Sequence, residues 1–268
     1  GLLYAERGVY QNAYDLDFSS FYPSIMTKIQ FPCSGGHLYR GDTAQEHFNG
    51  VETPGKWTYG IFEVPVRVPQ GNTNAKFFRF NKHNMYTHYD IKLAKFLEFQ
   101  FGVCSECLVY EKQDREAGRN WFSAYVQKLF KVKNTNKHAK KLLQVLHGAL
   151  CEKNDRILKY DQEANLLSKK PLVREGEVPV KLIPTSEGAK MKVRNLETPF
   201  KYPYARIGPF LNSFGRLKLV KAIFQHGFQS RVRAIQTDGF VVDGALDATK
   251  FQRTRPGDLR VKKQGKAT

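Results

Sequence analysis

The chain has 268 residues and is 41% hydrophobic, which is enough apolar content to bury a core and excludes a disordered protein. Its 43 lysines and arginines stand against 25 acidic residues, and the formal net charge of +18 at pH 7 indicates a polyanionic partner. Nucleic acid is the first candidate, because Lys and Arg contacts to phosphates release condensed counterions; a solvated basic surface is the alternative.

Two features of the sequence indicate where the protein resides. No run of about 18 apolar residues predicts a membrane span, and the N-terminus lacks the layout of a signal peptide. We therefore expect a cytoplasmic protein, in the host cell cytoplasm if a virus or a plasmid encodes it. Because the chain opens on Gly rather than Met, we also expect it to be a piece of a longer protein.

The four cysteines are too few and too scattered to form a disulfide framework, so we expect a reducing compartment. Cys104 and Cys107 form a CxxC pair, but a zinc site needs a second pair of ligands. Only Cys33 with His37 or His47 could supply that pair, and two ordinary buried thiols are the alternative interpretation.

The first half of the chain mixes strand and helix patterns. Residues 9–18 alternate and are rich in aromatic residues, which predicts a strand that carries Asp15 and Asp17 near its end. The patterns that follow predict, in order, a short helical stretch over 19–28, a turn-rich segment over 31–58, a strand over 59–68, a polar loop over 70–75, a helix over 89–101 and one long helix or two consecutive helices over 119–150.

The second half begins with a polar, basic segment, residues 154–201, which four prolines interrupt and which we expect to be an excursion with a short hairpin. Residues 209–227 return to helical spacing. Residues 231–243 predict two strands joined by a tight Thr-Asp-Gly turn. These elements together predict the α+β class with mostly antiparallel strands.

Two carboxylates stand where each could bind a ligand. Asp17 ends the first predicted strand, and small hydroxyl residues, an aromatic pair and a helix-starting Pro follow it. Asp15 lies two residues earlier on the same strand face, so spacing alone leaves either of the two as a metal ligand. Asp238 stands at a predicted hairpin tip, where an Asp-Gly pair is ordinarily a turn former.

A basic helical face lies between these carboxylates in the sequence. One polar set follows steps of four, three, four and three residues, which places it on one helical face: Lys133, Lys137, Lys140, Gln144 and His147. The opposite face carries leucines: Leu142, Leu143, Leu146 and Leu150. Phosphoryl transfer at a two-metal site needs carboxylates that bridge the ions and cations that hold a triphosphate. Solvated strand-end acids and an amphipathic surface helix are the alternative interpretations.

The motifs resemble those of the family B DNA polymerases. Residues 17–24, DFSSFYPS, resemble the first palm motif, Asp-x-x-Ser-Leu-Tyr-Pro-Ser, and residues 140–148, KKLLQVLHG, are similar to the fingers motif, Lys-x-x-x-Asn-Ser-x-Tyr-Gly. Residues 235–241, IQTDGFV, resemble the second palm motif, Tyr-x-Asp-Thr-Asp-Ser, and residues 212–216, NSFGR, resemble the Thr-x-x-Gly-Arg template-contact motif. The intervals most resemble the protein-primed branch of phages and linear plasmids.

The resemblance implies a template-directed DNA polymerase that transfers a deoxynucleotide to a primer 3′-hydroxyl. Asp17, rather than Asp15, and Asp238 would be the catalytic metal ligands, with the carbonyl of Phe18, for two Mg²⁺ ions or Mn²⁺ in their place. The nucleotide-binding residues would be Ser20, Phe21, Tyr22, Lys133, Lys140, Gln144, His147 and Gly148. The DNA-binding residues would be Asn212, Gly215, Arg216, Lys262 and Lys263. The partners would be a DNA primer–template, a deoxynucleoside triphosphate and a terminal priming protein.

The implied architecture is a polymerase palm with an antiparallel sheet flanked by helices, plus helical fingers and an inserted subdomain. Its parts would be the first part of the palm (1–69), an insertion resembling a terminal-protein-binding region (70–125), the fingers helix (126–160), a connecting excursion (161–205), the second part of the palm (206–250) and the start of a truncated thumb (251–268). The family's exonuclease would lie upstream of residue 1.

Several positions depart from the family motifs, and four of them bear on catalysis and base-pair packing. Gln236 replaces the first Asp of Asp-Thr-Asp, Gly239 replaces the Ser that follows, and Val145 and His147 replace the Ser and Tyr of the fingers motif. These departures motivate a second hypothesis, a catalytically degenerate polymerase relic that binds nucleic acid only. An unrelated basic α+β binding module is the third.

Overall fold

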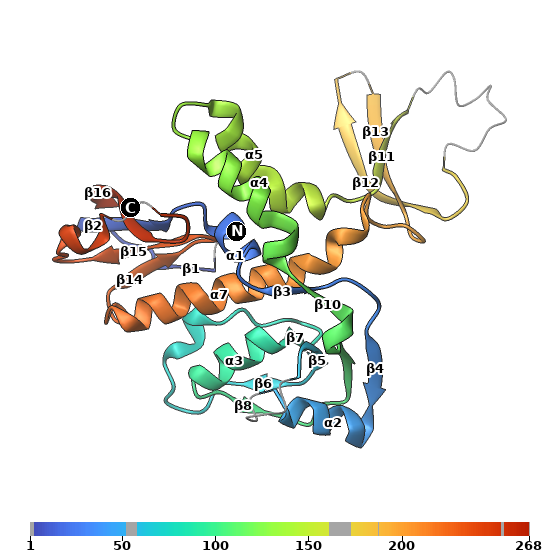
Figure 1. Ribbon diagram of the computed structural model, residues 1–268, viewed down its shortest axis with the longest axis horizontal. Helices are drawn as coiled ribbons and strands as arrows, with labels where there is room; N and C mark the ends of the chain where they lie inside the picture. The colour runs from blue at the N-terminus through green and yellow to red at the C-terminus, as the bar shows by residue number, and fades with distance from the viewer. Residues whose placement is uncertain (1–2, 52–57, 161–172, 187, 253–254, 268) are drawn as a thin grey trace. The chain divides into compact units, whose positions relative to one another are not determined.

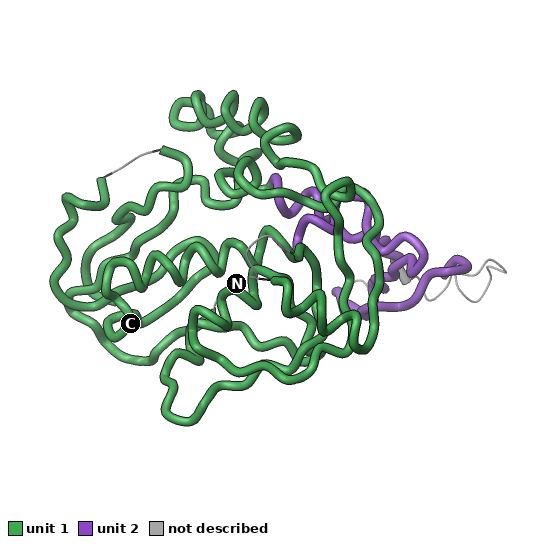
Figure 2. Tube along the Cα trace, turned by 60° about the horizontal axis from the view of Figure 1, so that its bottom comes forward, with its two compact units in different colours: residues 1–145, 209–268 green, residues 146–208 purple. Residues whose placement is uncertain are grey.

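The computed structural model describes residues 3–51, 58–160, 173–186, 188–252 and 255–267 (Figure 1). The chain divides into two compact units: residues 1–145 with 209–268 form unit 1, and residues 146–208 form unit 2 (Figure 2). The combination of helices and antiparallel sheets confirms the predicted α+β class. Within the described part of the chain, no helix combines the length and the apolar character that crossing a membrane requires.

Unit 1 contains a five-stranded antiparallel sheet in the order β1-β14-β15-β2-β16. Its strands are β1 (Tyr4–Ala5), β2 (Tyr10–Phe18), β14 (Val232–Ile235), β15 (Gly239–Asp243) and β16 (Leu259–Ala267). Alternation along β2 buries Leu16 and Phe18 and leaves Asp15 and Asp17 on the opposite face. The predicted strand over 9–18 and the predicted hairpin over 231–243 are therefore confirmed.

The edge strand β16 comes from the segment 251–268, which the family resemblance assigns to the start of a thumb. A short 3₁₀ helix, η4 (Ala248–Phe251), precedes it. The register of β16 pairs Arg260 with Asp17 and Lys263 with Asp15. The thumb assignment stays a prediction, and the strand within this segment belongs to the sheet that carries Asp17.

The helix α7 (Ile207–Gln225) is the helix predicted over 209–227. Its aromatic residues contact the inserted layer described next: the ring of Phe210 stacks on Tyr59 at 4.6 Å between centroids, and Phe214 meets Tyr89 at 5.0 Å. A helix with apolar residues on all sides is a buried helix. That is why the sequence of α7 shows helical spacing without a single apolar stripe.

The inserted layer, formed by the described residues of 30–51 and 58–117, packs against α7 (Figure 1). Its four-stranded sheet has the order β4 (His37–Arg40), β9 (Glu106–Val109), β5 (Gly60–Glu63) and β7 (Met85–Thr87). The other elements are α2 (Gly41–Asn49), α3 (His88–Phe96), η1 (Asn74–Phe77), η2 (Lys112–Asp114), β6 (Val66–Arg67) paired with β8 (Gln100–Phe101), and β3 (Gln30–Pro32) paired with β10 (Arg115–Ala117).

Three predictions for this layer need correction. The strand predicted over 59–68 is split, and its halves join different sheets, because Pro65 has no amide hydrogen for a strand ladder. The helix predicted over 89–101 ends at Phe96, and Glu98 follows with a φ of 62°. The helix α2 lies in the segment predicted to be turn-rich, because glycines stand at its start and just past its end.

Of the two alternatives predicted for residues 119–150, two consecutive helices are correct: α4 (Gly118–Val132) and α5 (Lys137–Leu150). The side chain of Asn136 accepts from the amides of His138 and Ala139 at 2.9 and 3.2 Å, which caps α5. Lys133 therefore lies outside α5, and the continuous polar face predicted from Lys133 to His147 is wrong. Within α5, Leu143 is buried whereas Leu142 is exposed.

The described part of unit 2 contains a three-stranded antiparallel sheet in the order β11 (Asp155–Tyr160), β13 (Gly188–Asn195) and β12 (Glu177–Thr185). Asp155 accepts from Arg194 and pairs with Lys192, and these two cations hold the pKa of its carboxyl well below the usual value. The hairpin predicted within 154–201 is thus a three-stranded sheet. Residues 161–172 of the predicted excursion lie outside the described residues.

Gly118 gives a test of how tightly α4 packs on the end of α1 (Phe21–Met26). A Cβ at this position would overlap the carbonyl oxygen of Met26 and lie 2.8 Å from the ring of Phe31. We predict that Gly118→Ala lowers the free energy of unfolding by about 1–3 kcal/mol, the usual cost of overpacking. Urea unfolding followed by circular dichroism measures the change.

Gly148→Ala is the matched control, since Gly148 is also helical but has nothing within 4 Å of an added Cβ. It should stabilise the protein by up to about 1 kcal/mol through helix propensity alone. Equal effects of the two substitutions would contradict the packing argument.

Candidate active site

The pairing of β2 with β15 brings Asp17 and Asp238 together. Gly239 is the register partner of Asp17, and the amide of Phe18 donates to the carbonyl of Asp238 at 2.9 Å. A Cβ on Gly239 would overlap the carbonyl oxygen of Leu16, so only glycine lets the two strands approach this closely. Gly239, which departs from the family motif, thus has a steric role in placing the second carboxylate beside the first.

The carboxylates at this junction repel one another. Burial raises the pKa of Asp238, and the negative charges of Asp17 and Asp15 raise it further, while Lys262 acts in the opposite direction. A raised pKa means that the ionised form of Asp238 lacks sufficient compensating charge. The junction is therefore a place where an added cation would be stabilised.

Two cations of β16 face these carboxylates. Arg260 donates from Nε to Asp17 Oδ1 at 2.9 Å, and Lys262 Nζ lies 3.5 Å from Asp15 Oδ2. Lys262, predicted to bind DNA, thus pairs with Asp15, and Lys263 beside it is exposed. Arg260 was missed by sequence reasoning, because it joins Asp17 from 243 positions away and no local pattern signals the contact.

The turn from β2 into α1 places the next predicted residues. Ser20 adopts a left-handed conformation with φ of 46°, and Phe21 begins the helix, stacking on Phe18 with 4.8 Å between ring centroids. Burial raises the pKa of Tyr22 to about 12, and the Tyr22 hydroxyl donates to the carbonyl of Thr237 at 3.5 Å, close to Asp238. Tyr22 is therefore a neutral, partly buried ring beside the two carboxylates.

Gly215 in α7 lies against this turn. A Cβ there would lie 3.2 Å from the ring of Phe21 and 3.5 Å from the ring of Tyr22. Gly215 was predicted to bind DNA, and the structure places it behind the aromatic pair. Its lack of a side chain lets α7 support the ring that the sequence assigns to the incoming sugar.

Lys133 connects α4 to the same turn. Its Nζ donates to the hydroxyls of Ser19 and Ser20, each at 3.2 Å. Burial lowers the pKa of Lys133, and the charges of Arg260 and Lys140 lower it further. Lys133 and Lys140 thus act on one another electrostatically, although a helix break separates them.

The other predicted fingers residues follow on α5. Lys140 and Gln144 are exposed residues of unit 1. His147 and Gly148 belong to unit 2, and burial lowers the pKa of His147. The structure therefore brings Lys133 to the turn beside the carboxylates, and Lys140 acts on Lys133 electrostatically. The functional roles of all these residues stay predictions.

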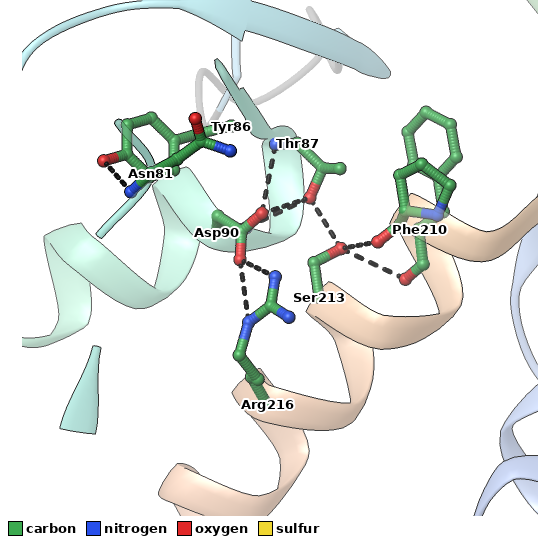
Figure 3. Close-up of polar contacts among 8 residues, drawn as sticks. Asn81, Tyr86, Thr87, Asp90, Phe210, Ser213 and Arg216 are labelled. Carbon is green, nitrogen blue, oxygen red and sulfur yellow. Dashed lines mark hydrogen bonds and ion pairs between the residues drawn. The ribbon is translucent and has the colours of Figure 1, made fainter. Parts of the chain in front are cut away.

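Arg216 is held by a buried polar network that sequence reasoning missed (Figure 3). Its Nη2 and Nε donate to Asp90 Oδ1 at 2.7 and 3.3 Å. Asp90 also accepts from the amide of Thr87 at 3.2 Å, and the Thr87 hydroxyl donates to the Ser213 hydroxyl at 2.6 Å. The only sequence signal was the Thr-x-x-Asp capping box of α3, which predicts the helix start but not the arginine.

Asn212 and Arg216 line a cavity of about 390 Å³ beside this network, together with Arg79 and Asn81. The predicted template-contact residues are thus exposed to one concave surface of unit 1. Asp90 fixes one edge of the Arg216 guanidinium, which leaves its remaining donors available at the cavity wall.

The cysteine pair fits the alternative interpretation of two buried thiols. Cys104 and Cys107 are buried, and burial raises their pKa values to about 11 and about 12. Thiols with raised pKa values stay protonated, whereas zinc binds thiolates. Among the described residues, no group of three or more His, Cys, Asp or Glu side chains is placed to hold a metal ion.

Comparison with known proteins decides the family. The family model described as DNA polymerase type B, organellar and viral, matches residues 2–146. The chain belongs to the type B DNA polymerases. The predicted family is confirmed. A comparison with curated proteins gave no match.

Solved structures show the fold of this type B polymerase chain. It is similar to Phi29 DNA polymerase complexed with primer–template DNA, with 14% identity and a TM-score of 0.62, over 98% of this chain and 44% of that chain. Phi29 DNA polymerase complexed with single-stranded DNA gives 15% identity and a TM-score of 0.61, again over 98% and 44%. The type B chain thus shares the Phi29 polymerase fold and spans less than half the length of those polymerases.

The ion pair between Asp90 and Arg216 gives a test of the network that supports α7. The side chain of Asp90 is 7% exposed, so Asp90→Ala would leave a partly buried guanidinium without its counter-ion. We predict a loss of about 3 kcal/mol in the free energy of unfolding. Asp90→Leu combined with Arg216→Met should restore much of this loss, which a double-mutant cycle in urea measures.

Glu106→Ala is the control, because it removes the partner of Arg40 from an exposed pair. It should cost about 1 kcal/mol or less. A loss as large as that of Asp90→Ala would show that burial of the Asp90–Arg216 pair is not the decisive factor.

Proposed function

We propose that the chain carries the nucleotidyl-transfer centre of a template-directed DNA polymerase, which adds deoxynucleotides to a primer 3′-hydroxyl. The observation that carries this proposal is the junction of β2 and β15, where Asp17 and Asp238 meet within a chain of the type B family. Because the chain spans 44% of the Phi29 polymerase, the activity, the DNA and nucleotide substrates and a terminal priming protein are all proposals for the whole protein.

The residues at the junction fit divalent magnesium. Their donors are carboxylate oxygens of Asp17 and Asp238 and the backbone carbonyl of Phe18, and oxygen donors suit Mg²⁺. The raised pKa of Asp238 indicates that a nearby cation would stabilise its ionised carboxylate. These three residues would hold two Mg²⁺ ions, with Mn²⁺ as an alternative. The bound metal would supply Lewis acidity for the primer hydroxyl and the phosphates.

The chain's own side chains have distinct tasks in the proposal. Lys133 and Lys140 neutralise the triphosphate of the incoming nucleotide, and the Lys133 bonds to Ser19 and Ser20 fix that charge beside the junction. Tyr22, held by burial and by Gly215 behind its ring, limits the space at the sugar. These residues position the nucleotide for in-line attack without themselves forming bonds.

The remaining predicted residues contact the nucleic acid and the new base pair. Gln144, His147 and Gly148 would lie against the nascent base pair, and Phe21 supports Tyr22 beneath the nucleotide. Asn212, Arg216 and the exposed Lys263 would contact DNA, with Gly215 and Lys262 supporting the site from behind. The Phi29 polymerase structures hold primer–template DNA and, in one case, incoming nucleotides, which supports these partners for the proposal.

DNA binding without catalysis is the second candidate function. The observation that favours it is Arg260, whose Nε lies 2.9 Å from Asp17 where a metal ion would otherwise bind. Gln236 in place of a carboxylate weakens metal binding in the same direction. Primer extension distinguishes the two functions, since only the first candidate incorporates nucleotides.

Removal of either junction carboxylate should abolish incorporation. We predict that Asp17→Ala and Asp238→Ala each slow primer extension by at least about a thousandfold, because a phosphoryl-transfer site loses charge stabilisation of that order when one such group is removed. Single-nucleotide extension of a labelled primer on the full-length polymerase measures the rate. Asp15→Ala, on the same face of β2, is the control and should reduce the rate far less. Equal losses for Asp15 and Asp17 would contradict the assignment.

Magnesium binding can be measured without activity. We predict that Mg²⁺ raises the free energy of unfolding, by about 2.7 kcal/mol at a hundredfold excess over its Kd, because the ion binds the folded chain. Asp238→Asn should largely remove this dependence, whereas Asp114→Asn, which alters a carboxylate paired with His37, should keep it. An identical magnesium response in both variants would rule out the junction as the binding site.

A further inference from the structure

A second concave surface of unit 1 is strongly basic. It is a cavity of about 660 Å³, a volume typical of ligand sites. Five of its lining residues are cations, and no Asp or Glu is among the described residues that line it: Lys28, Lys92, Lys112, Arg115 and Lys221. None of these residues belongs to the site around Asp17 and Asp238.

The five cations come from separate parts of the sequence. Lys28 follows α1, Lys92 lies in α3, Lys112 and Arg115 lie in and just after η2, and Lys221 lies in α7. A basic helix face arises easily from one amphipathic segment, but convergence from four segments onto one hollow does not. Like charges gathered on one surface repel one another, and a ligand of opposite charge would relieve that repulsion.

The positive charges that line the cavity lower the pKa values of two neighbouring side chains. Burial lowers the pKa of His88, and the charges of Lys92 and Arg115 lower it further. Burial also lowers the pKa of Lys218 to about 8, with Lys28 adding to the effect. The positive charges of the cavity lining thus act on two side chains of neighbouring elements, and Asp258 offsets part of the effect on Lys218.

The basic cavity lies on a different face of α7 from the active site. Phe214, Leu217 and Lys221 line the cavity and follow one helical face by steps of three and four. Gly215, one position on from Phe214, faces Phe21 and Tyr22. One helix therefore separates the candidate active site from the basic cavity.

The lining favours a phosphodiester strand over an acidic peptide. A phosphodiester backbone carries acceptors but no donors, so lysines and an arginine satisfy it completely. A peptide carries an amide donor on nearly every residue, and Gln30 and Tyr89 are the only described lining side chains that could accept from it. Peptide amides would be left unsatisfied over most of this surface.

We propose that this basic cavity binds the phosphate backbone of a single DNA strand outside the catalytic centre. The inference rests on the proposed function in so far as DNA is the substrate of the chain. The strand would run across α1, α3 and α7, so that the cavity anchors DNA while the junction of β2 and β15 acts on the primer.

The test uses the salt dependence of binding to an oligothymidylate. Lys28, Lys112 and Lys221 are exposed, so replacing all three by Gln should leave the fold intact. Each phosphate contact to a single strand contributes about 0.7 to the slope of log K against log salt concentration. The triple variant should therefore lower the magnitude of the slope by about 2, measured by fluorescence anisotropy.

The charge-matched control replaces Lys82, Lys131 and Lys181, which are exposed and do not line the cavity. Its slope should stay close to that of the parent. An unchanged slope in the first triple variant, or equal changes in both, would overturn the proposal. So would poly-glutamate that binds as tightly as oligothymidylate and loses as much affinity in the cavity variant, since an acidic protein would then be the better occupant.

The outcome is separable from that of the proposed function. Asp17→Ala should abolish primer extension and leave the salt slope of the parent unchanged. If the parent extends no primer but still loses slope in the cavity variant, the polymerase proposal fails and the DNA site stands. If primer extension depends on Asp17 but the salt slope is unchanged in the cavity variant, only the proposal of a DNA site in the cavity fails.

Discussion

The close approach of β15 to β2 is the constraint on which the candidate active site depends. Gly239 permits it, and the bond from the Phe18 amide to the Asp238 carbonyl fixes it. Two carboxylates held this close repel each other, which contributes to the raised pKa of Asp238 and would destabilise the sheet without compensating charge. The edge strand β16 offsets part of this repulsion, because Arg260 pairs with Asp17 and Lys262 pairs with Asp15. The same sheet therefore supplies both carboxylates and counter-charges.

The helix α7 connects that junction to the inserted layer and to the segment before β16. At Gly215 it supports Phe21 and Tyr22, at Arg216 it joins the Asp90 network of the inserted layer, and at Lys218 it donates to the carbonyl of Gly257, which precedes β16. Because α7 makes packed contacts on several sides, it cannot shift without disturbing more than one of them. A ligand that moved the inserted layer would therefore also change the contact between α7 and Tyr22.

Local features of this fold followed from the sequence, and long-range ones did not. The alternation of apolar and polar residues predicted the strand of Asp17, and the Asp-Gly pair predicted the hairpin of Asp238. Each pattern is complete within about ten residues. Arg260 and Asp90 escaped prediction, since their partners lie 243 and 126 positions away. The break before α5 was readable in Asn136, a strong N-cap residue, but the helical spacing continued across it and hid the signal.

The contact between Arg260 and Asp17 bears on whether this chain has kept its catalysis. Arg260 is 45% exposed and Asp17 15%, so the pair lies close to solvent, where such contacts contribute about 1 kcal/mol or less. A divalent cation bound by two carboxylates carries twice the charge of a guanidinium, and the side chain of Arg260 can swing into water at little cost. The pair therefore offers weak competition to Mg²⁺. The larger obstacle is the absence of a third carboxylate at Gln236. The steric fit of Gly239 shows that one departure from the family motif serves the geometry of the junction.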